Sequence, residues 1–296
     1  MGLMNIFKPK KPWIRFYSID PGVAEITPIY PARKLHRPWR TDALKSMNDP
    51  ARRCPYLRVE RLWKRSMDVI TGRDSHDGES MELAKHAITC PALTGIMDSG
   101  YILPAPGDFV IKTDGTGVNF EWISSGQFCD NTRYINSHIP DQTTGFRELV
   151  DQQKDVLDWT IKLETPWRVQ AHPDVVFIQV PVTYHKEDRF SCATGLVDPA
   201  YSYEINMQLF WHKIEEGEYH VKAGTPLAQW IPVHRDFLNA KGWNVVIETA
   251  NEHDVENNKI MDYQRAKEFN ELNSLSDRIK AHKKILSLNK NIERFN

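Results

Sequence analysis

The sequence predicts a mainly β protein with an N-terminal extended region and a long C-terminal helix. Short apolar stretches recur between residues 100 and 248, and turn-forming residues separate them, as in sandwich or barrel-like domains. Prolines at 166, 173, 181, 199, 226 and 232 suit strand edges and corners rather than helices. Beyond Val255, apolar residues recur at three- and four-residue steps without Gly or Pro, which predicts an amphipathic helix.

The individual elements follow from the same patterns. Residues 14–29 predict two strands around the Pro21-Gly22 turn, and residues 33–65 predict extended arms with a short strand at 56–63. A helical turn at 91–98 leads into strands at 100–104, 108–113 and 117–123, with a hairpin turn at 113–117. A short helix is expected at 145–152. Further strands are expected at 156–163, 167–171, 175–184, 192–197, 203–211, 218–222, 226–232 and 244–248.

Charge separates a basic N-terminal part from an acidic remainder, and the helical periodicity marks a third part at the C-terminal end. Residues 1–73 hold 16 Lys/Arg against 6 Asp/Glu, whereas residues 74–296 hold 22 against 33, which gives +10 and -11 and sums to the net charge of -1. We therefore expect a basic arm at 1–73, a β-rich core at 74–250 and the helix at 251–296. Two interpretations of the basic arm are open. It packs against an acidic surface of its own chain or of a sister subunit, or it faces phosphates or an acidic partner surface.

Cysteines and hydropathy predict the compartment. The four cysteines form no CxxC pair, so reduced, mostly buried thiols are expected rather than a zinc site or a disulfide framework. No apolar run is long enough for a membrane span or a signal sequence. The expected location is the cytoplasm.

The most informative motif lies at 195–230. It reads GLVDPAYSYEINMQLFWHKIEEGEYHVKAGTPLAQW, in which Asp198 follows a strand at a turn stiffened by Pro199, and Gly224 allows a tight turn between strands. The stretch resembles the central motif of the dUTPase and dCTP deaminase superfamily, G-x-[IV]-D-x-x-[YF]-x-G-E followed by G-x-x-[IL]-A-Q. The matching positions are Gly195, Val197, Asp198, Tyr201, Glu204, Gly224, Leu227, Ala228 and Gln229.

This resemblance implies a dUTPase-like β-clip or jelly-roll-type core with a nucleotide site. It implies that Asp198 orients a water for attack on the α-phosphate with Mg²⁺, that Tyr201 lies under deoxyribose, and that Glu204 and Gln229 belong to the nucleotide site. Three features depart from the family pattern. Tyr203 stands where the motif has glycine, Gln208 stands nearest the position of the deaminase glutamate, and no glycine-rich C-terminal arm is present. Because an amide cannot act as a general base, these departures predict lost catalysis.

A broader resemblance covers residues 14–235. The segments IRFYSIDPGVAEITPIYPA, CPALTGIMDSGYILPAPGDFVI and KAGTPLAQWIPVHR are similar to an uncharacterised protein family of tailed bacteriophages. This similarity implies a phage source, and therefore a location in the host cytoplasm or the virion, without implying an activity.

A metal-binding alternative rests on His172 and Asp174. These residues have the H-x-D form of iron(II)/2-oxoglutarate oxygenases, in which two histidines and one carboxylate leave open iron positions. His220 follows at an acceptable spacing and would complete the triad for Fe²⁺. The other interpretation is that His172 and Asp174 are surface or capping residues at a strand corner.

Three functions follow from these patterns. The first is a phage-encoded, non-catalytic protein without a cofactor, which acts by assembly or by binding a host factor or nucleotide. It would form homo-oligomers through the C-terminal helix, or bind other phage or host proteins, and would not associate with membrane. The second is a dNTP pyrophosphohydrolase, and the third is an Fe²⁺ oxygenase.

Overall fold

The computed structural model describes residues 12–48, 90–124, 134–143, 156–238, 247–255 and 258. The chain divides into two compact units, residues 1–240 and 241–296. The first unit holds every strand of the described ranges, and its architecture is mainly β, as the sequence predicts. In the second unit, the described residues contain a helical turn at 252–255.

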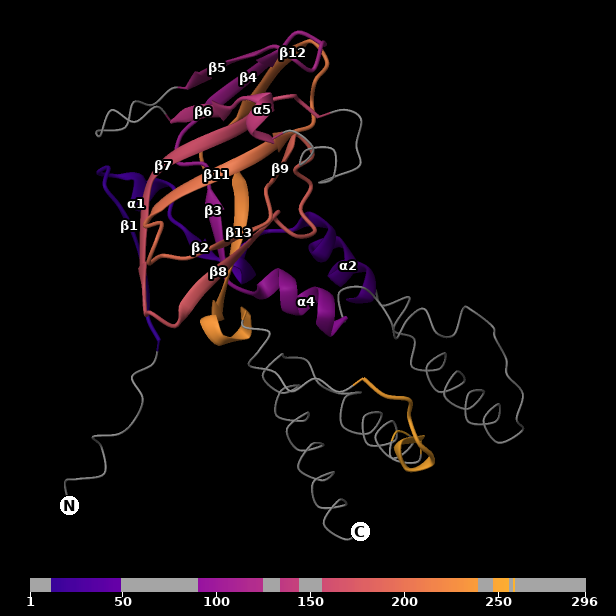
Figure 1. Cartoon of the computed structure of the whole chain (residues 1–296). Helices are drawn as coiled ribbons and strands as arrows, with labels where there is room; N and C mark the ends of the chain where they lie inside the picture. The colour runs from indigo at the N-terminus through magenta and orange to yellow at the C-terminus, as the bar shows by residue number, and fades with distance from the viewer. Residues whose placement is uncertain are drawn as a thin grey trace, which may run out of the picture. The chain divides into compact units, whose positions relative to one another are not determined.

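Three antiparallel sheets make up the first unit (Figure 1). The first sheet has the order β1 (Ile14–Ser18), β7 (Thr160–Ala171), β11 (Glu204–Trp211) and β9 (Phe190–Cys192), with β6 (Ile135–His138) also paired to β7. The second has the order β10 (Gly195–Val197), β8 (Val175–Val180), β13 (Pro226–His234), β3 (Tyr101–Pro104) and β2 (Tyr30–Pro31). The third has the order β12 (Gly217–Val221), β4 (Phe109–Thr113) and β5 (Phe120–Ser124).

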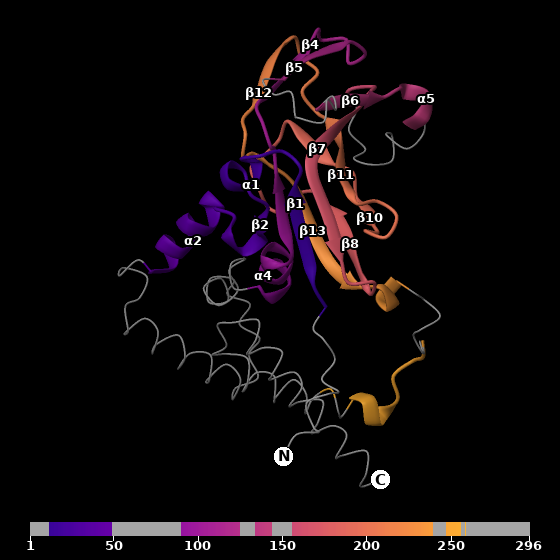
Figure 2. The ribbon, with the colours of Figure 1, turned by 90° about the vertical axis from the view of Figure 1, so that its left-hand side faces the viewer.

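The helices of this unit are short and lie beside the sheets (Figure 2). They are α1 (Val23–Ile26), the 3-10 turn η1 (Ala32–Lys34), α2 (Pro38–Asn48), α4 (Pro91–Asp98), α5 (Pro140–Thr143) and the 3-10 turn η4 (Arg235–Leu238). None of the helices in the described part of the chain is long and apolar enough to cross a membrane.

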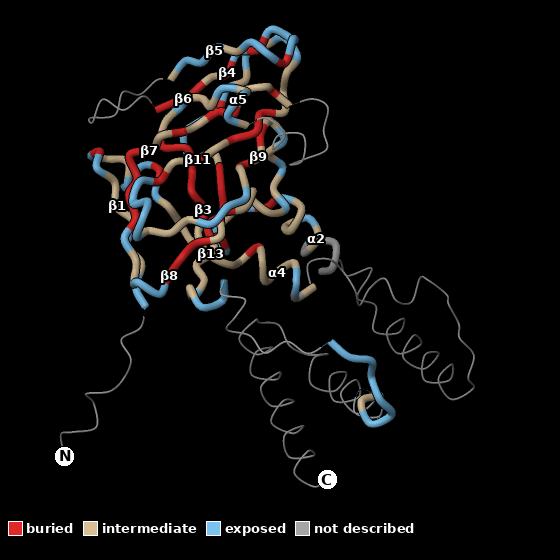
Figure 3. Tube along the Cα trace, in the orientation of Figure 1, coloured by how far each residue is buried: buried red, intermediate tan, exposed pale blue. Residues whose placement is uncertain are grey.

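The hydrophobic core joins all three sheets. Along β11, Ile205, Met207 and Leu209 are buried at every second position, which is the periodicity of a strand with one face against a core. Phe16 of the first sheet packs against Trp230 of the second, with ring centroids 6.3 Å apart. The buried stretches in Figure 3 accordingly concentrate on the inner strands β7, β8, β11 and β13.

Strand β7 runs through Pro166 because its neighbours change there. Residues 160–163 pair with β6, and residues 167–171 pair with β1, so the proline lies between two partners. On the other side, the register with β11 shifts between Glu204 and Asn206. A bulge at this point avoids the need for the N–H that proline lacks. The prediction of two strands, at 156–163 and 167–171, is therefore wrong.

Glycine is required at one close approach between strands. Gly100 has a φ of +70°, and a Cβ there would lie 2.0 Å from the backbone oxygen of Trp230. Only glycine fits at such a distance, and the Gly100 carbonyl is free to accept a hydrogen bond from the Ala32 N–H at 2.9 Å. This contact fixes the position from which α4 leads into β3.

Several other expectations are confirmed or corrected. The helical turn at 91–98 and the strands that follow it are confirmed as α4, β3, β4 and β5. The predicted strand at 23–29 begins as helix α1, and part of the arm expected at 33–65 is helix α2. The strand at 192–197 is interrupted, because β9 and β10 belong to different sheets. Outside the described residues lie most of the predicted helix at 251–296, the strand at 56–63, the helix at 145–152 and most of the strand at 244–248.

Candidate functional site

The motif turn between β10 and β11 is built around Asp198. Its backbone carbonyl accepts hydrogen bonds from the N–H groups of Tyr201 at 3.0 Å and Ser202 at 2.9 Å. Its carboxylate Oδ1 accepts a hydrogen bond from the Ala200 N–H at 3.0 Å. Aspartate commonly stabilises turns in this way. The turn leaves the Tyr201 side chain 90 % exposed.

The two strands on either side of this turn diverge into different sheets. Strand β10 pairs with β8, whereas β11 pairs with β7 and β9. The motif turn therefore does not join two paired strands, as the turn of a β-hairpin would. Tyr203, which replaces the motif glycine, fits here because its side chain is mostly exposed and its carbonyl accepts a hydrogen bond from the Val169 N–H at 2.8 Å.

The Asp198 carboxylate is bound by Arg235. The guanidinium contacts both carboxylate oxygens, at 2.5 Å and 2.8 Å, and its Nε donates a hydrogen bond to the Pro173 carbonyl at 3.0 Å. This bidentate arrangement is the strongest form of a carboxylate–arginine contact. The Arg235 guanidinium holds the pKa of Asp198 below its ordinary value. A carboxylate so stabilised is a poor proton acceptor, because a general base works best with a pKa near the operating pH.

Glu204 lies at the start of β11 and contacts Arg168. The Arg168 Nη2 and Glu204 Oε1 atoms are 3.4 Å apart. Arg168 is nearly buried, and its Nη1 donates hydrogen bonds to the carbonyls of Thr165 at 2.8 Å and Trp167 at 3.1 Å. Glu204 therefore balances a buried charge next to the β7–β11 bulge, which is a structural role.

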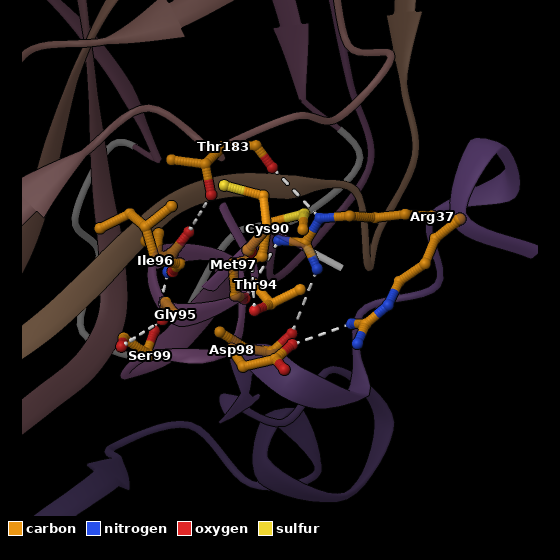
Figure 4. A network of polar contacts seen from close by, with 12 residues as sticks. Arg37, Cys90, Thr94, Gly95, Ile96, Met97, Asp98, Ser99 and Thr183 are labelled. Carbon is orange, nitrogen blue, oxygen red and sulfur yellow. Dashed lines mark hydrogen bonds and ion pairs between the residues drawn. The ribbon is translucent and has the colours of Figure 1, made fainter. Parts of the chain in front are cut away.

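Gln229 is fully buried and holds helix α4 against β13. Its Nε2 donates hydrogen bonds to the carbonyls of Ile96 and Ser99, both at 2.7 Å. Its Oε1 accepts a hydrogen bond from the Thr183 hydroxyl at 3.0 Å, within the network that Figure 4 shows. The last carbonyls of a helix lack partners within the helix, and Gln229 supplies one. Both polar atoms of its amide are therefore buried and already hydrogen-bonded within the protein.

Arg37 completes the end of α4. The side chain is 2 % exposed and donates hydrogen bonds to the carbonyls of Met97 at 3.3 Å and Thr183 at 3.1 Å (Figure 4). A cation is favourable at a helix C-terminus, where the carbonyl dipoles point outward. Burial lowers the pKa of Arg37, and the nearby carboxylate of Asp98 opposes that effect.

The candidate iron ligands do not gather at one place. His172 and Asp174 lie in the turn between β7 and β8, with the His172 Nδ1 atom 3.4 Å from Asp174 Oδ2. His220 belongs to β12, in the third sheet. The third group near Asp174 is instead His234, whose Nε2 atom is 3.8 Å from Oδ2. Among the residues that the structure describes, no three His, Cys, Asp or Glu side chains are arranged to hold a metal ion, so this donor set does not fit Fe²⁺.

Sequence reasoning missed two residues of this region. Arg235 follows β13 and binds Asp198, 37 residues earlier, and Arg37 reaches Met97, 60 residues later. No local pattern marks either residue, because each is defined by contacts distant in sequence. Of the thiols expected to be mostly buried, two lie in the described part of the chain: Cys192 is buried and Cys90 is partly exposed.

Comparisons with known proteins give weak structural likenesses. No family model matches the sequence, and no curated protein matches it significantly. Among solved structures, a native dUTPase of EIAV is similar with 13 % identity and a TM-score of 0.27, over 52 % of this chain and 85 % of that one. A mutant dUTPase from phage phi11 of S. aureus, which coordinates a structural Mg(II) ion, is similar with 13 % identity and a TM-score of 0.28, over 52 % of this chain and 84 % of that one. At these TM-scores, neither likeness establishes a shared activity.

Proposed function

We propose that this chain is a non-catalytic, phage-encoded protein that acts by assembly or by binding a partner in the host cytoplasm or the virion. The observation that carries the proposal is the bidentate contact between Asp198 and Arg235. It occupies the carboxylate that would otherwise orient a water molecule. Two further observations support a non-catalytic role: β10 and β11 belong to different sheets, and Gln229 is buried.

Exposed apolar side chains near the Asp198 turn support a binding role. The contact between Asp198 and Arg235 joins the turn to η4, and both segments carry large apolar groups on the surface. Tyr201 and Tyr203 are exposed in the turn, and Phe237 is 62 % exposed in η4. Apolar side chains that gather on a surface often mark a protein–protein contact. The partner is then a second copy of the chain, or another phage or host protein.

The second candidate is a dNTP pyrophosphohydrolase that uses Mg²⁺. The exposed Tyr201 favours it, because a ring in the turn after the aspartate is what the sequence resemblance implies for a sugar platform. Catalysis would require Asp198 to leave Arg235 before it could orient a water molecule. The structure offers no matching support for the oxygenase, because His220 lies in a different sheet from the other two candidate ligands.

A thermal-shift screen separates these functions. The purified full chain is heated with each dNTP and NTP in the presence of Mg²⁺, while light scattering gives its mass. The proposal expects no nucleotide to raise the unfolding temperature, together with an oligomer of defined mass or a protein partner recovered with the chain. Stabilisation by one pyrimidine nucleotide, lost in Tyr201→Ala, would overturn the proposal in favour of the second candidate.

A further inference from the structure

A groove of about 760 Å³ lies along the three-stranded sheet of β12, β4 and β5. This volume is in the range of pockets that hold a small molecule or a few peptide residues. Its lining includes Phe120, Trp122, Trp159, Glu121, Glu216 and Glu218. Figures 1 and 2 both place this sheet at the opposite end of the unit from η4, which contains Arg235, the partner of Asp198.

Aromatic rings form one part of the lining. Phe120 packs against two indoles, with its ring centroid 5.4 Å from that of Trp122 and 6.2 Å from that of Trp159. Trp122 is 37 % exposed although it belongs to a strand next to the core. An exposed ring of this size beside a hollow offers a face to an aliphatic chain or a cation.

Carboxylates dominate the charged part of the lining. Four acids, Asp114, Glu121, Glu216 and Glu218, are present against a single cation, Lys112. The Lys112 Nζ atom lies 3.5 Å from Glu218 Oε1, so Lys112 balances the charge of the Glu218 carboxylate. The Asp114 carboxylate accepts hydrogen bonds from Thr116 and Asn119 within its own loop. In the part of the chain that the structure describes, Glu121 and Glu216 have no ion pair, so the groove favours a positively charged occupant.

Strand β5 adds a backbone edge to the groove. Among the strands of the described ranges, β5 pairs with β4 alone, so its other side offers unpaired N–H and C=O groups. Glu121 is opposite Lys112 on β4, whereas Trp122 is opposite the buried Ile111. Successive side chains of a strand point to opposite faces, so the acidic and aromatic positions alternate along this edge.

We propose that this groove binds an extended peptide segment of a partner protein in which basic and aliphatic residues alternate. The peptide backbone adds a strand to β5. Its arginine or lysine side chains lie toward Glu121, and its aliphatic side chains lie toward Trp122 and Phe120 on the opposite face of β5. Glu216, at the β12 side of the groove, adds to the negative potential that attracts the basic residues. Strand addition with side chains read alternately on the two faces is an established mode of peptide recognition. The inference concerns a different sheet from the Asp198 turn and does not depend on the proposed function.

Fluorescence anisotropy with three labelled peptides tests this inference on the full chain. The first alternates arginine and valine over six residues, the second has glutamine in place of arginine, and the third keeps arginine but carries N-methyl groups on the amides that would pair with β5. We expect saturable binding of the first peptide, weakened by 0.5 M salt, and binding at least about tenfold weaker for the other two.

Variants locate the binding to the groove. Glu121→Gln with Glu216→Gln should weaken binding of the arginine peptide about tenfold, since two unpaired carboxylates are lost, and Trp122→Ala should weaken it further. Glu25→Gln is the matched control, because this exposed carboxylate in α1 lies outside the groove lining and should leave binding unchanged. Equal binding of the arginine and glutamine peptides, an unaffected carboxylate double variant with a wild-type unfolding temperature, or absence of saturable binding would each overturn the inference.

Discussion

Replacing Gln229 with leucine should destabilise the first unit strongly, because the side chain makes three buried hydrogen bonds. Two of them, to Ile96 and Ser99, are 2.7 Å long, and the third, from Thr183, is 3.0 Å long. A buried neutral hydrogen bond contributes about 1 kcal/mol, and a partner left without one costs about 1–3 kcal/mol. Leucine regains part of this through burial of its apolar surface. We expect a net loss of roughly 3 kcal/mol in the free energy of unfolding.

The measurement is urea unfolding followed by tryptophan fluorescence and circular dichroism. For a unit of this size, the expected loss corresponds to a fall of about 6–12 °C in the unfolding temperature. Gln170→Leu is the matched control, because Gln170 is exposed on β7 and accepts one hydrogen bond from Arg15 at 3.3 Å. It should change the free energy of unfolding by less than about 0.5 kcal/mol. If both substitutions have the same small effect, Gln229 does not hold α4 in place.

Further predictions concern other parts of the first unit. Gly100→Ala should destabilise the fold severely, because a Cβ there would lie 2.0 Å from the backbone of β13. Gly95→Ala is the matched comparison, since the space around Gly95 in α4 is open. Thermal unfolding should show it to be neutral or stabilising by up to about 1 kcal/mol. The stability difference between wild type and Asp198→Asn should be constant above about pH 5 and shrink as the pH falls toward the lowered pKa of Asp198. A constant difference down to about pH 2 would show that Arg235 does not stabilise the carboxylate. Cys192, whose pKa burial raises to about 12, should resist alkylation at pH 8 until the protein unfolds, as mass spectrometry of the modified peptides would show.

Strand positions follow from the sequence because they depend on short-range alternation. The strand at 204–211 buries Ile205, Met207 and Leu209 at the spacing that predicts it. Pro166 misled the prediction, since proline normally ends a strand. Here two different strands pair with the two halves of β7, and the register with β11 shifts beside the proline. Pairing of this kind is a property of the whole sheet rather than of the local sequence.

The chemistry of the motif could not be predicted from its residue types. Asp198 and Gln229 match the family pattern, yet one is bound to Arg235 and the other to carbonyls 130 and 133 residues away in sequence. A carboxylate in contact with water and one held by a guanidinium look identical in a sequence. The sequence also does not predict that Phe120, Trp122 and Trp159 line a common groove, because ordinary core packing explains tryptophans in strands equally well.

Pyrophosphate release tests the central claim most directly. The full chain is incubated with dUTP, dCTP, dATP and dGTP in turn, with and without Mg²⁺, beside the Asp198→Asn and Arg235→Gln variants. If the ion pair with Arg235 keeps Asp198 from orienting a water molecule, the wild-type chain releases no more pyrophosphate than the Asp198→Asn variant does. Mg²⁺-dependent release by the wild-type chain that disappears in Asp198→Asn would contradict the account and establish a nucleotide pyrophosphohydrolase.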